Sequence, residues 1–319
     1  MRLKNLLTPV LLATVVSTAA AQNDECSPYF GQAQNVCDAA VDGTRLFHPI
    51  AGLLVSGGNP VIGTAQSLGG LPHFFIGVRA NLVKVGLPDL NYDGTSNTVL
   101  LDDEIVFPSP VVEAGLGIWK GLSNGLLAID ALGSAQLLPT DQIDNLTVDE
   151  DARSISDIAL GLGYGARVGI LRGSFPIPAL SVSVMKRTIP RIQYGDITDP
   201  SQDYQYAVDL KATNIRVTAS TKLLFINVAA GLGWDNYTGD AEILFREPIS
   251  GIAQPPIDIE MDNTRTMMFL DALLDFPIFK IAGEIGYQSG KDQDLPTDFE
   301  GIDDTKGKIF GSVGIRFGF

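Results

Sequence analysis

Apolar and polar residues alternate along most of the chain with a period of two, which is typical of β-strands whose two faces meet different environments. In residues 157–171, for example, Ile158, Leu160 and Leu162 alternate with small residues and with Arg167. Each such segment is long enough to cross a bilayer as a tilted strand, which takes ~9–11 residues. The segments with this pattern are residues 71–85, 110–120, 126–137, 157–171, 178–188, 204–218, 221–235, 263–275, 278–288 and 308–319.

The connectors between these segments alternate between short turns and long loops, which is typical of bacterial outer-membrane barrels. The long loops are residues 86–109, 138–156, 189–203, 236–262 and 289–307. We therefore expect residues 71–319 to form an all-β fold, a transmembrane antiparallel β-barrel of about ten strands. Twelve strands are the alternative if residues 97–108 and 239–247 also cross. A soluble sandwich would alternate too, but it fits the connector lengths poorly.

The last strand indicates what covers the apolar face. Ile315, Phe317 and Phe319 share one face, and Arg316 lies on the other. Strands cross lipid only as a closed sheet, because every backbone polar group must be satisfied internally. The strand resembles the closing strand of bacterial outer-membrane proteins. That resemblance implies that Phe319 is a barrel-closing signal read by the barrel-insertion machinery.

The first 21 residues have the layout of a cleaved signal peptide. Arg2 and Lys4 precede an apolar stretch, and small residues precede a cut after Ala21. A buried N-terminal helix is the alternative interpretation. In an exported chain the only two cysteines, Cys26 and Cys37, are expected to form a disulfide. We therefore predict export to the bacterial outer membrane.

Residues 22–70 do not alternate. Apolar positions such as Val36, Ala40 and Phe47 have helical spacing, Pro49 would kink or split the helix, and a turn-rich linker follows at residues 56–70. We expect a periplasmic helical segment that enters the barrel as a plug or packs beneath it as a lid. Both interpretations stay open.

This region carries a resemblance. The helix, the linker with "GTAQSLGG" and the first strand "HFFIGVRANLV" resemble exported barrels of unknown function from Bacteroidetes and neighbouring phyla. More distantly the chain is similar to long-chain fatty-acid transporters, which also have an N-terminal hatch and an Asn-Pro near the first strand, here Asn59-Pro60. Those transporters have more strands than ten, so none of their ligand residues is transferred.

The chain is acidic, with a net charge of −15, yet its mean hydropathy is +0.18. Most acidic residues fall in the long loops, and this balance disfavours nucleic-acid binding. The charges expected to line the lumen either neutralise one another in a narrow interior or form a constriction selective for small polar solutes. They are Arg79, Glu113, Asp130, Arg167, Arg187, Asp209, Lys211, Asp271, Lys280, Glu284 and Arg316.

The sequence also bears on metal binding and on catalysis. Asp89, Asn91 and Asp93 in "DLNYDG" match the first half of a calcium loop, although Leu100 stands where the closing glutamate belongs, so an Asx turn is the alternative. No other cofactor is expected. The two histidines, His48 and His73, lack an evident catalytic partner, so we predict that the chain is not an enzyme.

The sequence thus favours passive transport of a small solute through a barrel gated by its N-terminal segment. The alternatives are hatch-type uptake of hydrophobic compounds and a non-conducting structural or adhesive barrel that presents acidic loops. The expected partners are outer-membrane lipid, the insertion machinery and a small solute or hydrophobic ligand.

Overall fold

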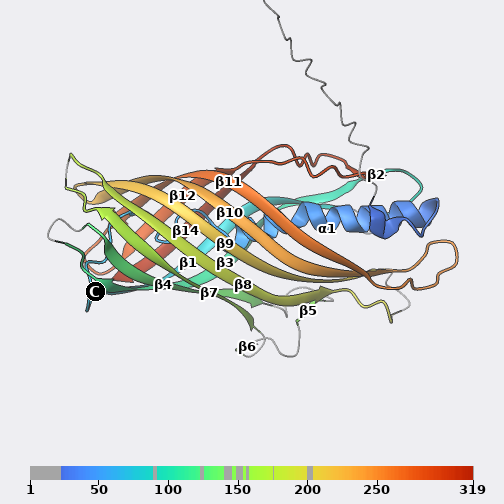
Figure 1. Ribbon diagram of the computed structural model, residues 1–319, viewed down its shortest axis with the longest axis horizontal. Coiled ribbons are helices and arrows are strands. Elements are labelled where there is room, and N and C mark those ends of the chain that lie inside the picture. The colour runs from blue at the N-terminus through green and yellow to red at the C-terminus, as the bar shows by residue number, and fades with distance from the viewer. Residues whose placement is uncertain are drawn as a thin grey trace, which may run out of the picture.

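The part of the chain that the structure describes forms a closed antiparallel barrel of ten strands with one α-helix before the first strand (Figure 1). The computed structural model describes residues 23–88, 92–122, 126–139, 146–148, 154–155, 158–174, 176–199 and 204–318. The barrel strands are β1 (Phe74–Pro88), β3 (Leu101–Trp119), β4 (Ala128–Pro139), β7 (Ile158–Leu171), β8 (Ala179–Tyr194), β9 (Tyr204–Leu223), β10 (Ile226–Phe245), β11 (Ile257–Asp275), β12 (Lys280–Gln288) and β14 (Lys308–Gly318). The other elements are η1 (Asp24–Cys26), α1 (Gln32–Ser56), β2 (Thr98–Val99), β5 (Leu146–Val148), β6 (Ser154–Ile155) and β13 (Asp298–Phe299).

Closure of the barrel confirms the predicted fold. Each barrel strand pairs with the next in sequence, and β14 returns to β1 in a register that runs from Phe75↔Gly318 to Val83↔Phe310. The additional crossings that a twelve-strand barrel would need are instead extensions of β3 and β10. No helix in the described part of the chain is both long enough and apolar enough to span a bilayer.

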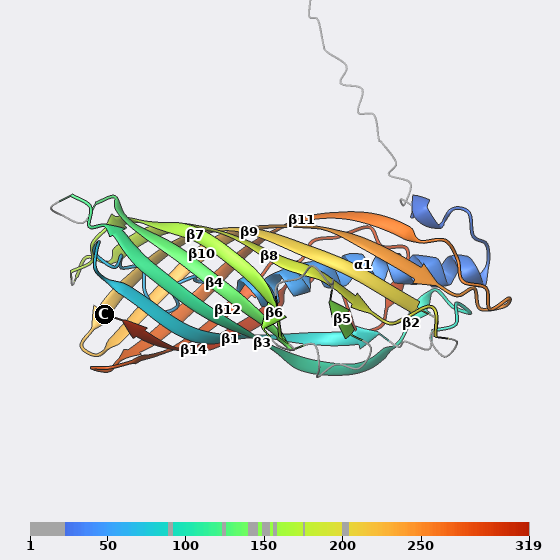
Figure 2. The same ribbon diagram turned by 90° about the horizontal axis from the view of Figure 1, so that it is seen from below.

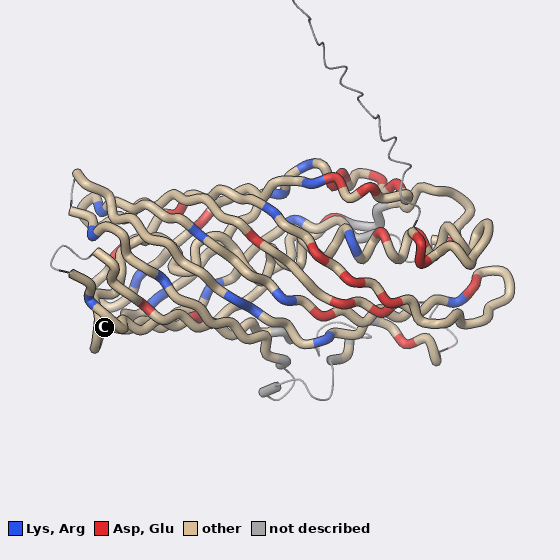
Figure 3. Tube along the Cα trace, viewed as in Figure 1, with Lys and Arg blue, Asp and Glu red and all other residues tan. Residues whose placement is uncertain are grey.

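The longest strands reverse their polarity part way along. On the outer face of β11, Leu270 and Met268 are exposed near the short turns, whereas Glu260 and Asp262 are exposed near the long loops. On its inner face the order is opposite, with Asp271 at the first end and Ile259 at the second. Figure 3 shows acidic residues gathered over the long-loop part of these strands. Lipid outside one half of the barrel and water outside the other account for the reversal.

Exposed aromatic residues lie at both edges of the apolar outer band. Phe74, Trp119 and Phe317 are near the short turns, and Trp234 and Tyr287 are nearer the long loops. Aromatic rings favour the membrane–water interface, so this arrangement fits a bilayer around the short-turn half of the barrel.

The N-terminal segment lies inside the barrel and does not pack beneath it as a lid. Its assignment as a periplasmic plug stays a prediction. Helix α1 starts at the end with the long loops, where Val41 packs in one cluster with Ile243 and Phe245 of β10 (Figures 1 and 2). Residues 57–73 then run through the barrel to the opposite end, where β1 begins. The helix packs on apolar wall residues of the long-loop half, whereas most buried charges of the wall lie in the short-turn half.

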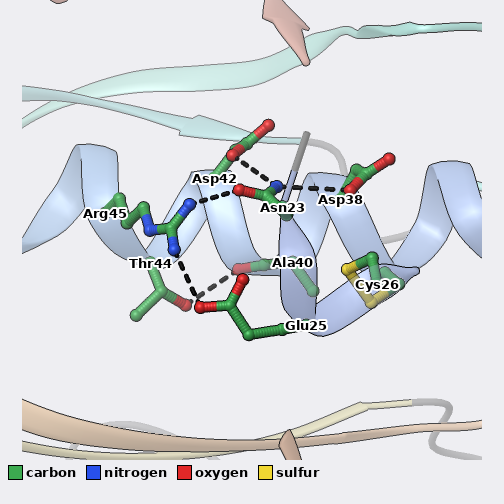
Figure 4. The surroundings of a disulfide bond; sticks show 9 residues. Asn23, Glu25, Cys26, Asp38, Ala40, Asp42, Thr44 and Arg45 are labelled. Atoms are coloured by element: carbon green, nitrogen blue, oxygen red, sulfur yellow. Dashed lines mark hydrogen bonds and ion pairs between the residues drawn. A yellow bond between two sulfur atoms is a disulfide. The ribbon is translucent and has the colours of Figure 1, made fainter. Parts of the chain in front are cut away.

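The start of this segment is fixed to the long-loop end by several bonds (Figure 4). A disulfide joins Cys26 in η1 to Cys37 in α1, with Cα atoms 5.7 Å apart. The side-chain amide of Asn23 donates to Asp42 at 2.8 Å, and Asp42 also accepts from the backbone N–H of Thr297 at 2.8 Å. Burial raises the pKa of the Asp42 carboxyl. Pro49 does not split the helix, which continues to Ser56.

Candidate functional site: a polar clasp around the linker

The interior of the short-turn half contains most of the buried charged residues of the wall and is crossed by residues 57–73, which we call the linker. Glu284 of β12 accepts hydrogen bonds from the backbone N–H groups of Gly58 at 3.0 Å and Asn59 at 2.6 Å. Its cross-strand neighbour Asp271 of β11 accepts from the side chain of Asn59 at 2.7 Å and from the N–H of Gly63 at 3.0 Å. The two carboxylates therefore hold the first turn of the linker.

Arginines bind the carbonyl groups of the same turn. Arg79 of β1 donates to the carbonyl of Asn59 at 2.7 Å, and Arg216 of β9 donates to those of Gly58 at 2.7 Å and Gly57 at 2.9 Å. A buried segment without regular structure must find partners for its backbone outside itself. Charged partners supply stronger hydrogen bonds than neutral ones.

The part of the linker nearer to β1 is also bound through its backbone. Asp130 of β4 accepts from the N–H of Leu68 at 3.0 Å, and the hydroxyl of Ser220 on β9 accepts from the N–H of Ala65 at 2.9 Å. We call the strand residues that bind the linker backbone the polar clasp. Its members are Arg79, Asp130, Arg167, Arg216, Ser220, Asp271 and Glu284.

Ion pairs within the wall balance the charges of Arg79, Asp130 and Arg216. Arg79 contacts Glu113 at 2.7 Å, Arg167 contacts Asp130 at 2.8 Å, and Arg216 contacts Asp235 at 2.5 Å. All six side chains are buried. Each of these charges would carry a large desolvation cost in this interior without its partner, so the three pairs stabilise the buried arginines and acids.

Two glycines let the linker approach the wall. A Cβ at Gly58 would lie 2.4 Å from Oε2 of Glu284, so only glycine brings its N–H to that carboxylate. Gly63 has φ +84°, and a Cβ there would lie 2.4 Å from Cβ of Leu273. The spacing of glycines in "SGGNPVIG" thus follows from a close fit inside the barrel.

The structure places most of the predicted lumen residues in the interior and brings several of them together. The interior and buried ones are Arg79, Glu113, Asp130, Arg167, Arg187, Asp271 and Glu284. Lys280 and Arg316 lie on the inner face near the short turns and are only partly buried; Lys280 pairs with Asp275, and Arg316 lies 5.3 Å from the centre of the Phe75 ring.

The assignment of Asp209 and Lys211 to the lumen was wrong. They point outward from the long-loop half of β9 and pair with each other at 3.8 Å, while Leu210 between them is buried inside. The reversal of polarity explains the error, since charged residues face water outside this part of the barrel.

Sequence reasoning also missed the pair Arg216–Asp235, although both residues lie in predicted strands. The signal was present in β9, because Ile215 and Val217 alternate with Arg216 in the half of the strand that faces lipid. The linker residues that the clasp binds could not be predicted, because the sequence does not show which backbone N–H and C=O groups a charged side chain will bind.

The remaining predicted site residues are not brought together by the described part of the chain. Asp93 is exposed and accepts hydrogen bonds from the N–H and hydroxyl of Thr95 at 3.0 and 2.7 Å, while Asp89 and Asn91 lie outside the described residues. Phe319 lies outside them as well. The described residues contain no group of three or more His, Cys, Asp or Glu side chains arranged for a metal. The calcium loop stays a prediction.

Comparisons with known proteins bear on the fold. No protein-family model matches the chain, and no curated protein matches it. The chain is similar to the outer-membrane protease OmpT from Escherichia coli, with 10% identity and a TM-score of 0.37 over 80% of this chain and 100% of that one. It is similar to the translocator domain of the autotransporter NalP from Neisseria meningitidis, with 11% identity and a TM-score of 0.34 over 88% of this chain and 96% of that one. It is also similar to the toluene transporter TbuX from Ralstonia pickettii, with 9% identity and a TM-score of 0.30 over 83% of this chain and 92% of that one.

The first of these comparisons overturns the prediction that the chain is not an enzyme, because a barrel similar to this one is named as a protease. At such low identity and TM-score the likeness concerns the fold alone and transfers no activity or residue. The closed sheet and the apolar outer band fit a bacterial outer-membrane β-barrel.

Proposed function

We propose that this barrel carries out passive transport of a small solute across the outer membrane and that its N-terminal segment is the plug. The observation that carries the proposal is the course of the linker, which occupies the lumen along the half of the barrel that faces lipid. Hydrogen bonds to the clasp hold it there, and hydrogen bonds can exchange with water when the segment moves.

Release of the linker would leave a narrow lumen lined by the clasp. Charges of both signs would face it, among them Arg79, Arg216, Asp271 and Glu284. Rings of charged side chains select permeant species by their field, so small polar or zwitterionic solutes fit this lining. A wide aqueous channel does not fit a barrel of ten strands.

Conductance in planar bilayers tests the proposal. A variant without residues 23–70 should show steady openings, whereas the full chain should be mostly closed. A folded but silent deletion variant would support the non-conducting structural barrel instead. Folding of each variant is checked by its heat-modifiable migration in gels.

A milder pair of variants tests the clasp itself. Asp271→Asn combined with Glu284→Gln should raise the frequency of openings at least tenfold, because amides accept weaker hydrogen bonds from the linker than carboxylates do. The matched control is Asp240→Asn with Glu260→Gln, a cross-strand pair of acids on the exposed outer face. Equal effects of the two double variants would contradict a gating role for the clasp.

Hatch-type uptake of a hydrophobic compound is the second candidate function. The resemblance around Asn59-Pro60 to long-chain fatty-acid transporters supports it, and so does an apolar cavity beside α1. Asn59 has a defined contact with the clasp, since its side-chain amide donates to Asp271 at 2.7 Å and its side-chain oxygen accepts from the N–H of Val61 at 3.1 Å. Outer-membrane lipid and the insertion machinery remain the proposed partners, and calcium in the loop after β1 remains a proposed ligand.

A further inference from the structure

A cavity of about 340 Å³ lies at the long-loop end between α1 and the inner face of β9. Phe47 and His48 of the helix form one side, Tyr204, Tyr206 and Leu210 of β9 form another, and Phe299 closes it from the loop before β14. The volume is within the range of small-molecule sites, roughly 300–1,000 Å³.

The lining of the cavity is uncharged. None of the residues that form it is Asp, Glu, Lys or Arg. The rings of Tyr204 and Tyr206 stack with centroids 6.0 Å apart, and the Tyr204 hydroxyl is already engaged with the carbonyl of Tyr92 at 3.0 Å. His48 is only 4% exposed, and burial lowers its pKa to about 4, so the ring is neutral at pH 7.

A second cavity nearby differs from the first in having a charged lining. It also contacts His48 and has a volume of about 300 Å³, and its charged residues include Arg45, Glu260, Asp262 and Lys291. The two cavities therefore suit different solutes. An apolar cavity of sufficient size binds small apolar molecules, because water gains few partners in it.

We propose that the uncharged cavity is a binding site for a small uncharged apolar molecule, aromatic or alicyclic, of about the size of two fused rings. Aromatic walls supply its contacts, and the absence of a cationic lining residue together with the acidic outer surface disfavours anions. Binding does not depend on conduction, so this inference stands or falls separately from the transport proposal.

The test is titration calorimetry of the full-length protein in detergent with two probes that share a ring system. 1-Naphthol is uncharged at pH 7, and 1-naphthalenesulfonate is an anion. Detergent without protein gives the blank for partitioning into micelles. We expect saturable binding of one 1-naphthol per barrel and at least tenfold weaker binding of the sulfonate.

Substitutions that fill the cavity test whether 1-naphthol binds there. Gly43→Leu should fill the cavity, since a Cβ at Gly43 would lie 3.7 Å from the ring of Phe299, and Ala51→Leu adds volume from a second lining position. Gly283→Leu is the matched control, because Gly283 faces lipid and a Cβ there has its nearest neighbour at 4.0 Å. Either filling variant should weaken 1-naphthol binding at least tenfold, and the control should not.

Three results would overturn the proposal. They are no saturable heat above the blank for the wild type, equal affinity for the sulfonate, and undiminished binding in a folded filling variant.

Discussion

Several buried side chains of the barrel wall bind the backbone of the linker as well as one another. Glu284 and Asp271 accept N–H groups of the linker, and Arg79 and Arg216 donate to its carbonyls. The alternation of the strands predicted that most of these charges face inward. It could not predict what they bind, because their partners are main-chain groups brought close only by the fold.

One prediction at this scale concerns the buried pair Arg167–Asp130. Asp130→Asn should lower the free energy of unfolding by about 3–5 kcal/mol, because Arg167 would keep its charge without a counterion in the interior. The measurement is urea unfolding in detergent followed by tryptophan fluorescence. The control is Glu104→Gln in the exposed pair Lys84–Glu104, which should cost less than about 1 kcal/mol. Equal losses of unfolding free energy in the two variants would contradict the expected difference between the buried and the exposed ion pair.

At the scale of single elements, the reversal of polarity along the long strands decides how the sequence must be interpreted. In β11 the same outer face carries Leu270 near the short turns and Asp262 near the long loops. The period of two predicts such a strand correctly throughout its length. It does not predict which face is inside unless the position of the lipid is also known, and this is why Asp209 and Lys211 were misplaced.

The reversal can be tested with the same substitution at two outward positions of β11. Leu270→Arg should destabilise the folded barrel by about 2–4 kcal/mol, because it places a charge in the hydrocarbon region. Thr264→Arg lies in the half that faces water and should change stability by less than about 0.5 kcal/mol. Unfolding in lipid vesicles measures both. If Thr264→Arg cost as much as Leu270→Arg, the bilayer would have to extend further along the strand.

At the scale of the whole molecule, the N-terminal segment and the barrel form a single core. The first described residue, Asn23, lies at the long-loop end, and the linker reaches β1 only after passing through the barrel (Figure 2). By the general rule for these barrels the short turns face the periplasm and the long loops face the exterior. The start of α1 is then on the cell surface.

Surface labelling tests this topology. An epitope inserted between Gln22 and Asn23 should be recognised by antibody on intact cells. The same epitope in the short turn at Leu224 and Phe225 should be recognised only after the outer membrane is permeabilised. Protection of the first epitope in intact cells would mean that the segment enters from the periplasm, and that this barrel does not follow the rule for short turns and long loops.

The sequence alone determined the barrel, a strand number of about ten and the inward direction of most buried charges, while the structure excluded the alternative of twelve strands. These follow from local alternation and from the requirement that strands in lipid close on themselves. Only the tertiary structure decided the course of the N-terminal segment, the pairing of Arg216 with Asp235 and the shape of the apolar cavity. Each of these depends on contacts between residues far apart in the chain, and the pattern along one strand carries no information about the segment that packs inside it.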